Sequence, residues 1–138
     1  MAKKFYVSIH AIIRAEGKAL ALHKNIFSDG TPCDLWTLPG GKINENEEPM
    51  DCLFREIKEE LNVDLQGTPR FVGVYIDING FSDGTGLIIL NYLVDIPKLF
   101  TPHLDTEHSH FVWLAWEDFL DLKFHNKKVA MKDILNEI

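Results

Sequence analysis

The stretch of sequence that decides the fold is residues 41–63, GKINENEEPMDCLFREIKEELNV. Its apolar side chains recur at spacings of three and four, which at about 100° per residue gathers them into one stripe of a helix. Pro49 suits the first helical turn, where no N–H donor is needed, and Asn62 tolerates the left-handed conformation in which helices often end. The pattern therefore predicts a helix from about Pro49 to Asn62 that packs on a sheet through these residues: Met50, Leu53, Phe54, Ile57 and Leu61.

Three carboxylates are expected beside this apolar stripe. On the same projection Glu56, Glu59 and Glu60 fall within one arc of roughly 100°. Glu56 and Glu60 are one turn apart, so their repulsion costs roughly a few tenths of a kcal/mol unless a cation intervenes, and carboxylates suit Mg²⁺ or Mn²⁺. The alternative is a solvated face, as on most Glu-rich helices. Arg55 favours the metal site, because it can pair with an acidic residue one turn away and also reach Glu47 at the helix entrance.

The spacing of these residues resembles the Nudix box. That pattern is a Gly, five residues, a Glu, seven residues, then Arg-Glu-aliphatic-any-Glu-Glu-any-Gly-aliphatic. Residues 35–42 also resemble the segment that leads into the box in many members. Asn62 stands where the box usually has Gly, a replacement that the left-handed conformation tolerates. The matching positions are Gly41, Glu47, Arg55, Glu56, Ile57, Glu59, Glu60 and Val63.

The resemblance implies a fold, a reaction and a cofactor. The fold is of the α/β class, a sandwich with a mixed β-sheet between helices. The reaction is hydrolysis of a phosphoanhydride bond in a nucleoside diphosphate linked to another moiety, with water attacking phosphorus. The cofactor is Mg²⁺ or Mn²⁺ held by Glu56 and Glu60, with Glu59 either a further ligand or the base that deprotonates the water. Arg55 and Glu47 complete the expected catalytic set.

The substrate and two competing functions stay open at this level. A nucleoside triphosphate is the first expectation, because the chain is short, and nucleotide sugars and dinucleoside polyphosphates follow closely. One alternative is a nucleotide-binding module that keeps the fold without turnover, although no carboxylate of the box is lost. The other is an isomerase, which would need a nucleophile or acid such as Cys52, placed near the acidic arc by the helical projection.

Residues outside the helix extend the expected site. Gly40, Gly41 and Lys42 are expected to contact substrate, Lys42 as a phosphate ligand, and Lys24 occupies a place where relatives often carry a basic residue. Both lysines are equally compatible with simple solvation.

A cluster of potential ligands precedes the last expected strand. Its spacing matches no familiar zinc pattern, so a polar loop followed by one strand face is the preferred interpretation. The resemblance implies a further acidic ligand or base from a loop at about this point, for which Glu107 is the candidate and Asp105 the second choice. The cluster consists of His103, Asp105, Glu107, His108 and His110.

The rest of the chain predicts strands around this helix. Residues 25–34 have loop composition, a turn is expected at Glu16 and Gly17, and a Lys-rich final helix is expected through Ile138. With no repeat, linker or low-complexity tract, residues 1–138 are expected to form one domain. The expected strands are residues 5–14, 19–24, 71–78, 87–94 and 110–115.

Composition excludes several classes of partner. The formal net charge of −7 disfavours sequence-independent binding to nucleic-acid polymers or anionic membranes, which depends on Lys and Arg neutralising phosphates. The sequence contains no run of about 20 apolar residues that would span a bilayer. A cytoplasmic protein, monomeric or homodimeric, acting on a small nucleotide or other pyrophosphate is therefore expected, with Cys33 and Cys52 as free thiols.

Overall fold

The structure is a computed structural model, and it describes residues 2–27, 29–124 and 127–136. Its elements are β1 (Phe5–Ala15), β2 (Lys18–Ile26), β3 (Pro32–Thr37), β4 (Gly40–Lys42), α1 (Pro49–Leu61), β5 (Arg70–Asp77), β6 (Gly86–Asp95), β7 (His110–Ala115), α2 (Trp116–Asp121), β8 (Lys123–Phe124), β9 (Val129–Ala130) and a 3₁₀ turn at Met131–Asp133. None of the helices in these ranges is long and apolar enough to cross a membrane.

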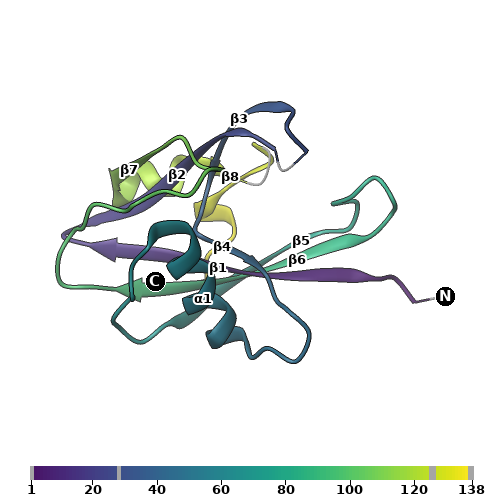
Figure 1. The fold of residues 1–138 in the computed structure, drawn as a ribbon, viewed down its shortest axis with the longest axis horizontal. Coiled ribbons are helices and arrows are strands. Elements are labelled where there is room, and N and C mark those ends of the chain that lie inside the picture. Colours follow the sequence, from purple (N-terminus) through teal and green to yellow (C-terminus); the bar gives the residue numbers. More distant parts are fainter. Residues whose placement is uncertain (1, 28, 125–126, 137–138) are drawn as a thin grey trace.

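The main sheet is mixed and is organised around β1. Its strand order is β3-β2-β1-β6-β5, with β4 paired to β1 and β7 paired to β2. β1 and β6 run parallel over ten residue pairs, whereas the other pairings are antiparallel. Along its other edge β1 pairs first with β4, at residues 8–10, and then with β2, at residues 14 and 15. The short strand β4 therefore lies beside the N-terminal half of β1 (Figure 1).

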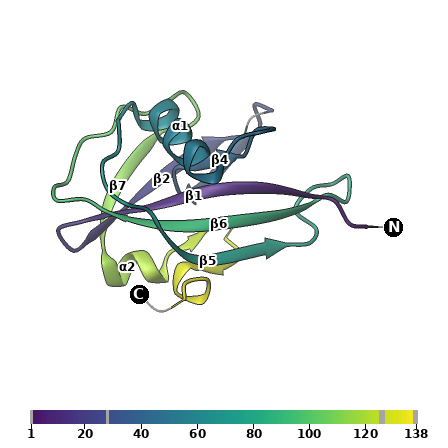
Figure 2. The ribbon, with the colours of Figure 1, turned by 90° about the horizontal axis from the view of Figure 1, so that it is seen from below.

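Helical and irregular segments cover both faces of this sheet. Figure 2 shows α1 on one side and α2 with the C-terminal segment on the other. The α1 side buries Leu53, Ile57 and Leu61 against side chains of β1 and β2. The opposite side buries Phe119 and Phe124 in a second apolar cluster. The expected α/β sandwich with a mixed sheet is confirmed.

The decisive helix forms where the sequence predicts it. α1 begins at Pro49 and ends at Leu61, and Asn62 follows with φ 55° and ψ 42° in the left-handed region. The expected strands are likewise present within one or two residues of their expected ends. The connection between β2 and β3 is shorter than residues 25–34, because β2 extends to Ile26 and β3 begins at Pro32.

The C-terminal part differs from the sequence prediction. Among the described residues, the expected helix through Ile138 is wrong beyond Asp121, where α2 ends and the β8–β9 hairpin begins. Residues 125, 126, 137 and 138 lie outside the described ranges. Lys127 has φ of +64°, a value that the interior of an α-helix does not permit. Phe124 on the hairpin is fully buried, so packing against the sheet takes precedence over a continued helix.

Candidate active site

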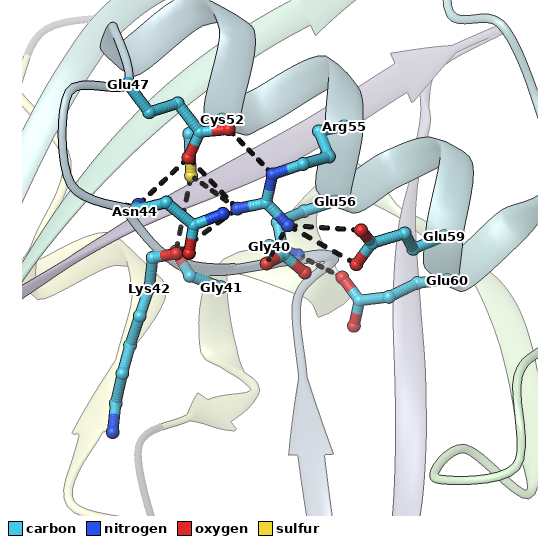
Figure 3. A network of polar contacts seen from close by, with 10 residues as sticks. All are labelled: Gly40, Gly41, Lys42, Asn44, Glu47, Cys52, Arg55, Glu56, Glu59 and Glu60. Carbon is cyan, nitrogen blue, oxygen red and sulfur yellow. Dashed lines mark hydrogen bonds and ion pairs between the residues drawn. The ribbon is translucent and has the colours of Figure 1, made fainter.

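The candidate site lies where α1 crosses the short strand β4. β4 is held beside β1 by the register pairs Ile9 with Gly41 and His10 with Gly40. Figure 3 shows the acidic side chains of α1 gathered over this strand, with Glu56 and Glu60 nearest to its backbone.

Two glycines let the backbone of β4 lie close to β1 on one side and to α1 on the other. Gly40 has φ of +152°, and a Cβ there would overlap the carbonyl oxygen of Ile9. Its N–H donates a hydrogen bond of 2.7 Å to Glu60 Oε1. A Cβ on Gly41 would lie 2.5 Å from the carboxyl carbon of Glu56. Gly40 therefore allows β4 to lie close to β1 and offers its N–H to Glu60, whereas Gly41 leaves the space that the Glu56 carboxylate occupies.

Arg55 ties the helix to the preceding loop and to its own acidic neighbours. Its Nε donates to Glu47 Oε2 at 2.7 Å and its Nη2 to Glu47 Oε1 at 3.0 Å. Its Nη1 donates to Glu56 at 2.9 Å and to Glu59 at 3.2 Å. The Arg55 guanidinium, with the Asn44 N–H, lowers the pKa of Glu47 to about 2. The pairing of Arg55 with Glu47 that the sequence suggested is thus present (Figure 3).

The three acidic residues of the arc experience different environments. Only 9% of the Glu60 side chain is exposed, compared with 15% for Glu56 and 57% for Glu59. Burial, reinforced by the charges of Glu56, Asp105 and Glu107, raises the pKa of Glu60 to about 9, although the Gly40 N–H acts in the opposite direction. Burial also raises the pKa of Glu56, against the influence of Arg55.

The donor set fits a hard divalent cation. Glu56 and Glu60 bring carboxylate oxygens to one region, where the negative charges of Glu56, Asp105 and Glu107 act on Glu60. Oxygen-only ligands of this kind match Mg²⁺ and Mn²⁺. Glu59 lies next to them on the exposed side, joined to Glu56 through Arg55 Nη1.

The loop between β6 and β7 adds two residues that sequence reasoning did not place. Asp105, named there only as the second choice, and His108 converge on Glu60, with one potential ligand atom from each of the three residues within 4.8 Å of the others. The Asp105 N–H donates to the Glu60 carbonyl at 3.1 Å, and the His103 N–H to the Leu61 carbonyl at 3.0 Å. The sequence does signal this contact through the high density of Asp, Glu and His residues before β7. That density alone is also typical of a polar loop, which is the preferred interpretation of the sequence.

The remaining candidates divide into near and distant groups. Lys24 Nζ lies 3.9 Å from Glu107 Oε2, and Glu107 is close enough to Glu60 to raise its pKa. Lys42 is different, because its Nζ lies over the rings of Tyr6, at 4.2 Å, and of Phe81, at 4.7 Å. Figure 3 shows its side chain extending away from the carboxylates.

The environment of Cys52 bears on the alternative chemistry. Its side chain is fully buried in the apolar cluster under α1, and its thiol points to the Gly41 carbonyl oxygen, 3.7 Å away. Burial raises the pKa of this thiol to about 12. A neutral, enclosed thiol is a poor nucleophile. The position of Cys52 near the acidic arc therefore does not make it a reactive group.

Comparisons with known proteins agree on the family. The sequence model described as the NUDIX domain matches residues 4–135. The m7GpppN-mRNA hydrolase of Saccharomyces cerevisiae is 42% identical over 60 residues, which are 44% of this chain and 6% of that enzyme's length. The CTP pyrophosphohydrolase of Escherichia coli is 30% identical over 112 residues, covering 81% of this chain and 77% of that enzyme.

The solved structures agree on the fold. The MutT protein of Methanosarcina mazei Go1 superimposes with a TM-score of 0.72 at 26% identity, covering 89% of this chain and 86% of that one. Coverage of 89% of this chain means that the similarity is not confined to the acidic helix.

Proposed function

The chain belongs to the Nudix family, and we propose that it is a metal-dependent pyrophosphohydrolase acting on nucleoside diphosphates linked to another moiety. The single observation that carries this proposal is the seating of Glu56 and Glu60 against β4, with Glu59 beside them and Arg55 bonded to both Glu56 and Glu59. A purely structural surface helix has no need of a glycine that leaves room for one of its carboxylates, or of a strand N–H that binds another.

In the proposed reaction each acidic residue has a distinct task. Glu56 and Glu60 would hold Mg²⁺ or Mn²⁺, with Glu59 as a further ligand or as the base for the attacking water. The cation, when bound, would neutralise the charge that develops on the phosphoryl oxygens. Glu107, on the neighbouring loop, is the candidate for an additional acid or base, since its charge already acts on Glu60.

The supporting residues fix the acids in place. The Gly40 N–H holds Glu60 Oε1, and Arg55 orients Glu56 and Glu59 while its own position is fixed by Glu47. Pre-oriented groups of this kind lower the barrier because they need no rearrangement when charge develops. Lys24 is proposed to contact substrate phosphate at the rim, where its present partner is Glu107.

We propose a nucleoside triphosphate as the substrate. The support is the match to CTP pyrophosphohydrolase, which extends over most of both chains. A small nucleotide also suits the net charge of −7, which disfavours a nucleic-acid polymer. The match to the decapping enzyme covers only 6% of that protein, so a capped RNA end is the less favoured substrate.

A substrate panel tests the proposal. Purified protein would be incubated with Mg²⁺ or Mn²⁺ and with ordinary and oxidised nucleoside triphosphates, nucleotide sugars, dinucleoside polyphosphates and a methylated cap dinucleotide, and products identified by chromatography. Glu60→Gln serves as the matched inactive control. Turnover of a triphosphate that is lost with EDTA is the expected result. Nucleotide affinity by calorimetry without turnover of any class would instead support a binding module and contradict the enzymatic proposal.

A further inference from the structure

His108 is buried between two carboxylates. Only 3% of its side chain is exposed. Its Nδ1 lies 2.7 Å from Asp105 Oδ1, and its Nε2 lies 3.6 Å from Glu60 Oε2. Both ring nitrogens of this enclosed histidine are therefore directed at carboxylates.

The Asp105 contact sets the orientation of the ring. An ionised carboxylate only accepts hydrogen bonds, so we assign a proton to Nδ1, which donates to Asp105 Oδ1. This bond fixes the ring plane and directs Nε2 towards Glu60. Asp105 is itself held, because its N–H is bonded to the carbonyl oxygen of Glu60 at 3.1 Å.

Glu60 is bounded on two sides. Its Oε1 accepts the Gly40 N–H at 2.7 Å, and its Oε2 lies 3.6 Å from His108 Nε2, a contact longer than a hydrogen bond. The hydrogen bond from β4 fixes one oxygen, and the buried ring from the loop before β7 leaves the other oxygen little room to rotate. Neighbouring groups that restrain a metal-binding carboxylate commonly change metal affinity by about 10- to 100-fold when removed.

We propose that His108, oriented by Asp105, is a positioning residue that fixes the Glu60 carboxylate for binding the divalent cation. This inference rests on the proposed function, because it assigns Glu60 the role of a ligand. The loop before β7 would then contribute a residue that orients a metal ligand, in addition to the acidic candidate Glu107.

The test measures Mn²⁺ binding directly, by electron paramagnetic resonance, in the absence of substrate. His108→Asn keeps an amide near Asp105 but is too short to reach Glu60, whereas His108→Gln places its amide near the position of Nε2. His103→Asn, at an exposed histidine of the same loop, is the matched control. Melting temperatures in EDTA report folding, and His108→Leu is a second loss variant if His108→Asn does not fold.

The expected result is that His108→Asn binds Mn²⁺ about tenfold more weakly, that His108→Gln recovers most of this affinity, and that His103→Asn matches the wild type. Equal Mn²⁺ affinity in the wild type, His108→Asn and His108→Leu would overturn the positioning role. Failure of the wild-type protein to bind Mn²⁺ at all would overturn the proposed function itself, and with it the inference.

Discussion

Replacing Glu60 with glutamine is expected to stabilise the metal-free protein while removing its activity. Glu60 has a folded-state pKa of about 9 against a reference of 4.5, so between these values the folded protein keeps a proton that the unfolded chain releases. The free energy of unfolding therefore falls as the pH rises through this window, by about 1.4 kcal/mol per unit. At about pH 7.5 the upper limit of this cost is about 4 kcal/mol.

Glutamine removes this cost and keeps the shape of the side chain. Its amide oxygen can still accept the Gly40 N–H, and its amide nitrogen would take the place of Oε2 beside His108. For a domain of this length the upper limit corresponds to a rise in Tm of roughly 12 °C, at about 3 °C per kcal/mol. Turnover should fall by orders of magnitude, because the variant cannot supply a carboxylate to the cation.

Thermal unfolding in EDTA, followed by circular dichroism between pH 5 and 8.5, measures this effect. The Tm advantage of Glu60→Gln over the wild type should be small at pH 5 and grow as the pH rises. Glu59→Gln is the matched control, since its side chain is 57% exposed and its Tm should follow the wild type. A Glu60→Gln variant that is less stable than the wild type at pH 8.5, or whose Tm difference does not change with pH, would refute the reasoning.

Three further substitutions separate the tasks of neighbouring residues. Glu59→Gln should lower turnover by orders of magnitude with little change in Tm, and a wild-type rate in steady-state assays would remove Glu59 from the reaction. Gly41→Ala should reduce kcat and Mn²⁺ affinity together, because its Cβ would lie 2.5 Å from the Glu56 carboxyl group; unchanged Mn²⁺ titrations would show that the carboxylate can move aside. Cys52→Ser should retain most activity, since the thiol is buried with a pKa raised to about 12, whereas a lost reaction would revive a role for this cysteine.

The parts of the molecule that the sequence predicts well are those fixed by local spacing. α1 follows from its apolar period, and its end follows from the tolerance of Asn62 for left-handed geometry. The contact of Arg55 with Glu47 joins residues eight positions apart, with the first turns of α1 between them, so helical geometry brings the two side chains within reach. The grouping of Glu56, Glu59 and Glu60 has the same local origin, and their catalytic roles remain predictions.

The features that sequence reasoning did not resolve depend on distant packing. Asp105 and His108 face Glu60 because backbone bonds tie their loop to the last turn of α1, and nothing in the local pattern before β7 fixes that path. Lys42 lies over aromatic rings of β1 and of the β5–β6 turn, which only the register of β4 on β1 determines. The C-terminal hairpin exists because Phe124 is buried against the opposite face of the sheet, where tertiary packing outweighs helical propensity.

Arg55 gives the acidic site an internal counter-ion. Its Nη1 bonds to both Glu56 and Glu59, while Glu47 anchors the rest of the guanidinium. The positive charge of Arg55 thus offsets the electrostatic repulsion between Glu56 and Glu59 without a bound metal ion. On the proposed function, a cation would therefore meet acidic side chains that are already ordered, and its binding would require little rearrangement of the chain.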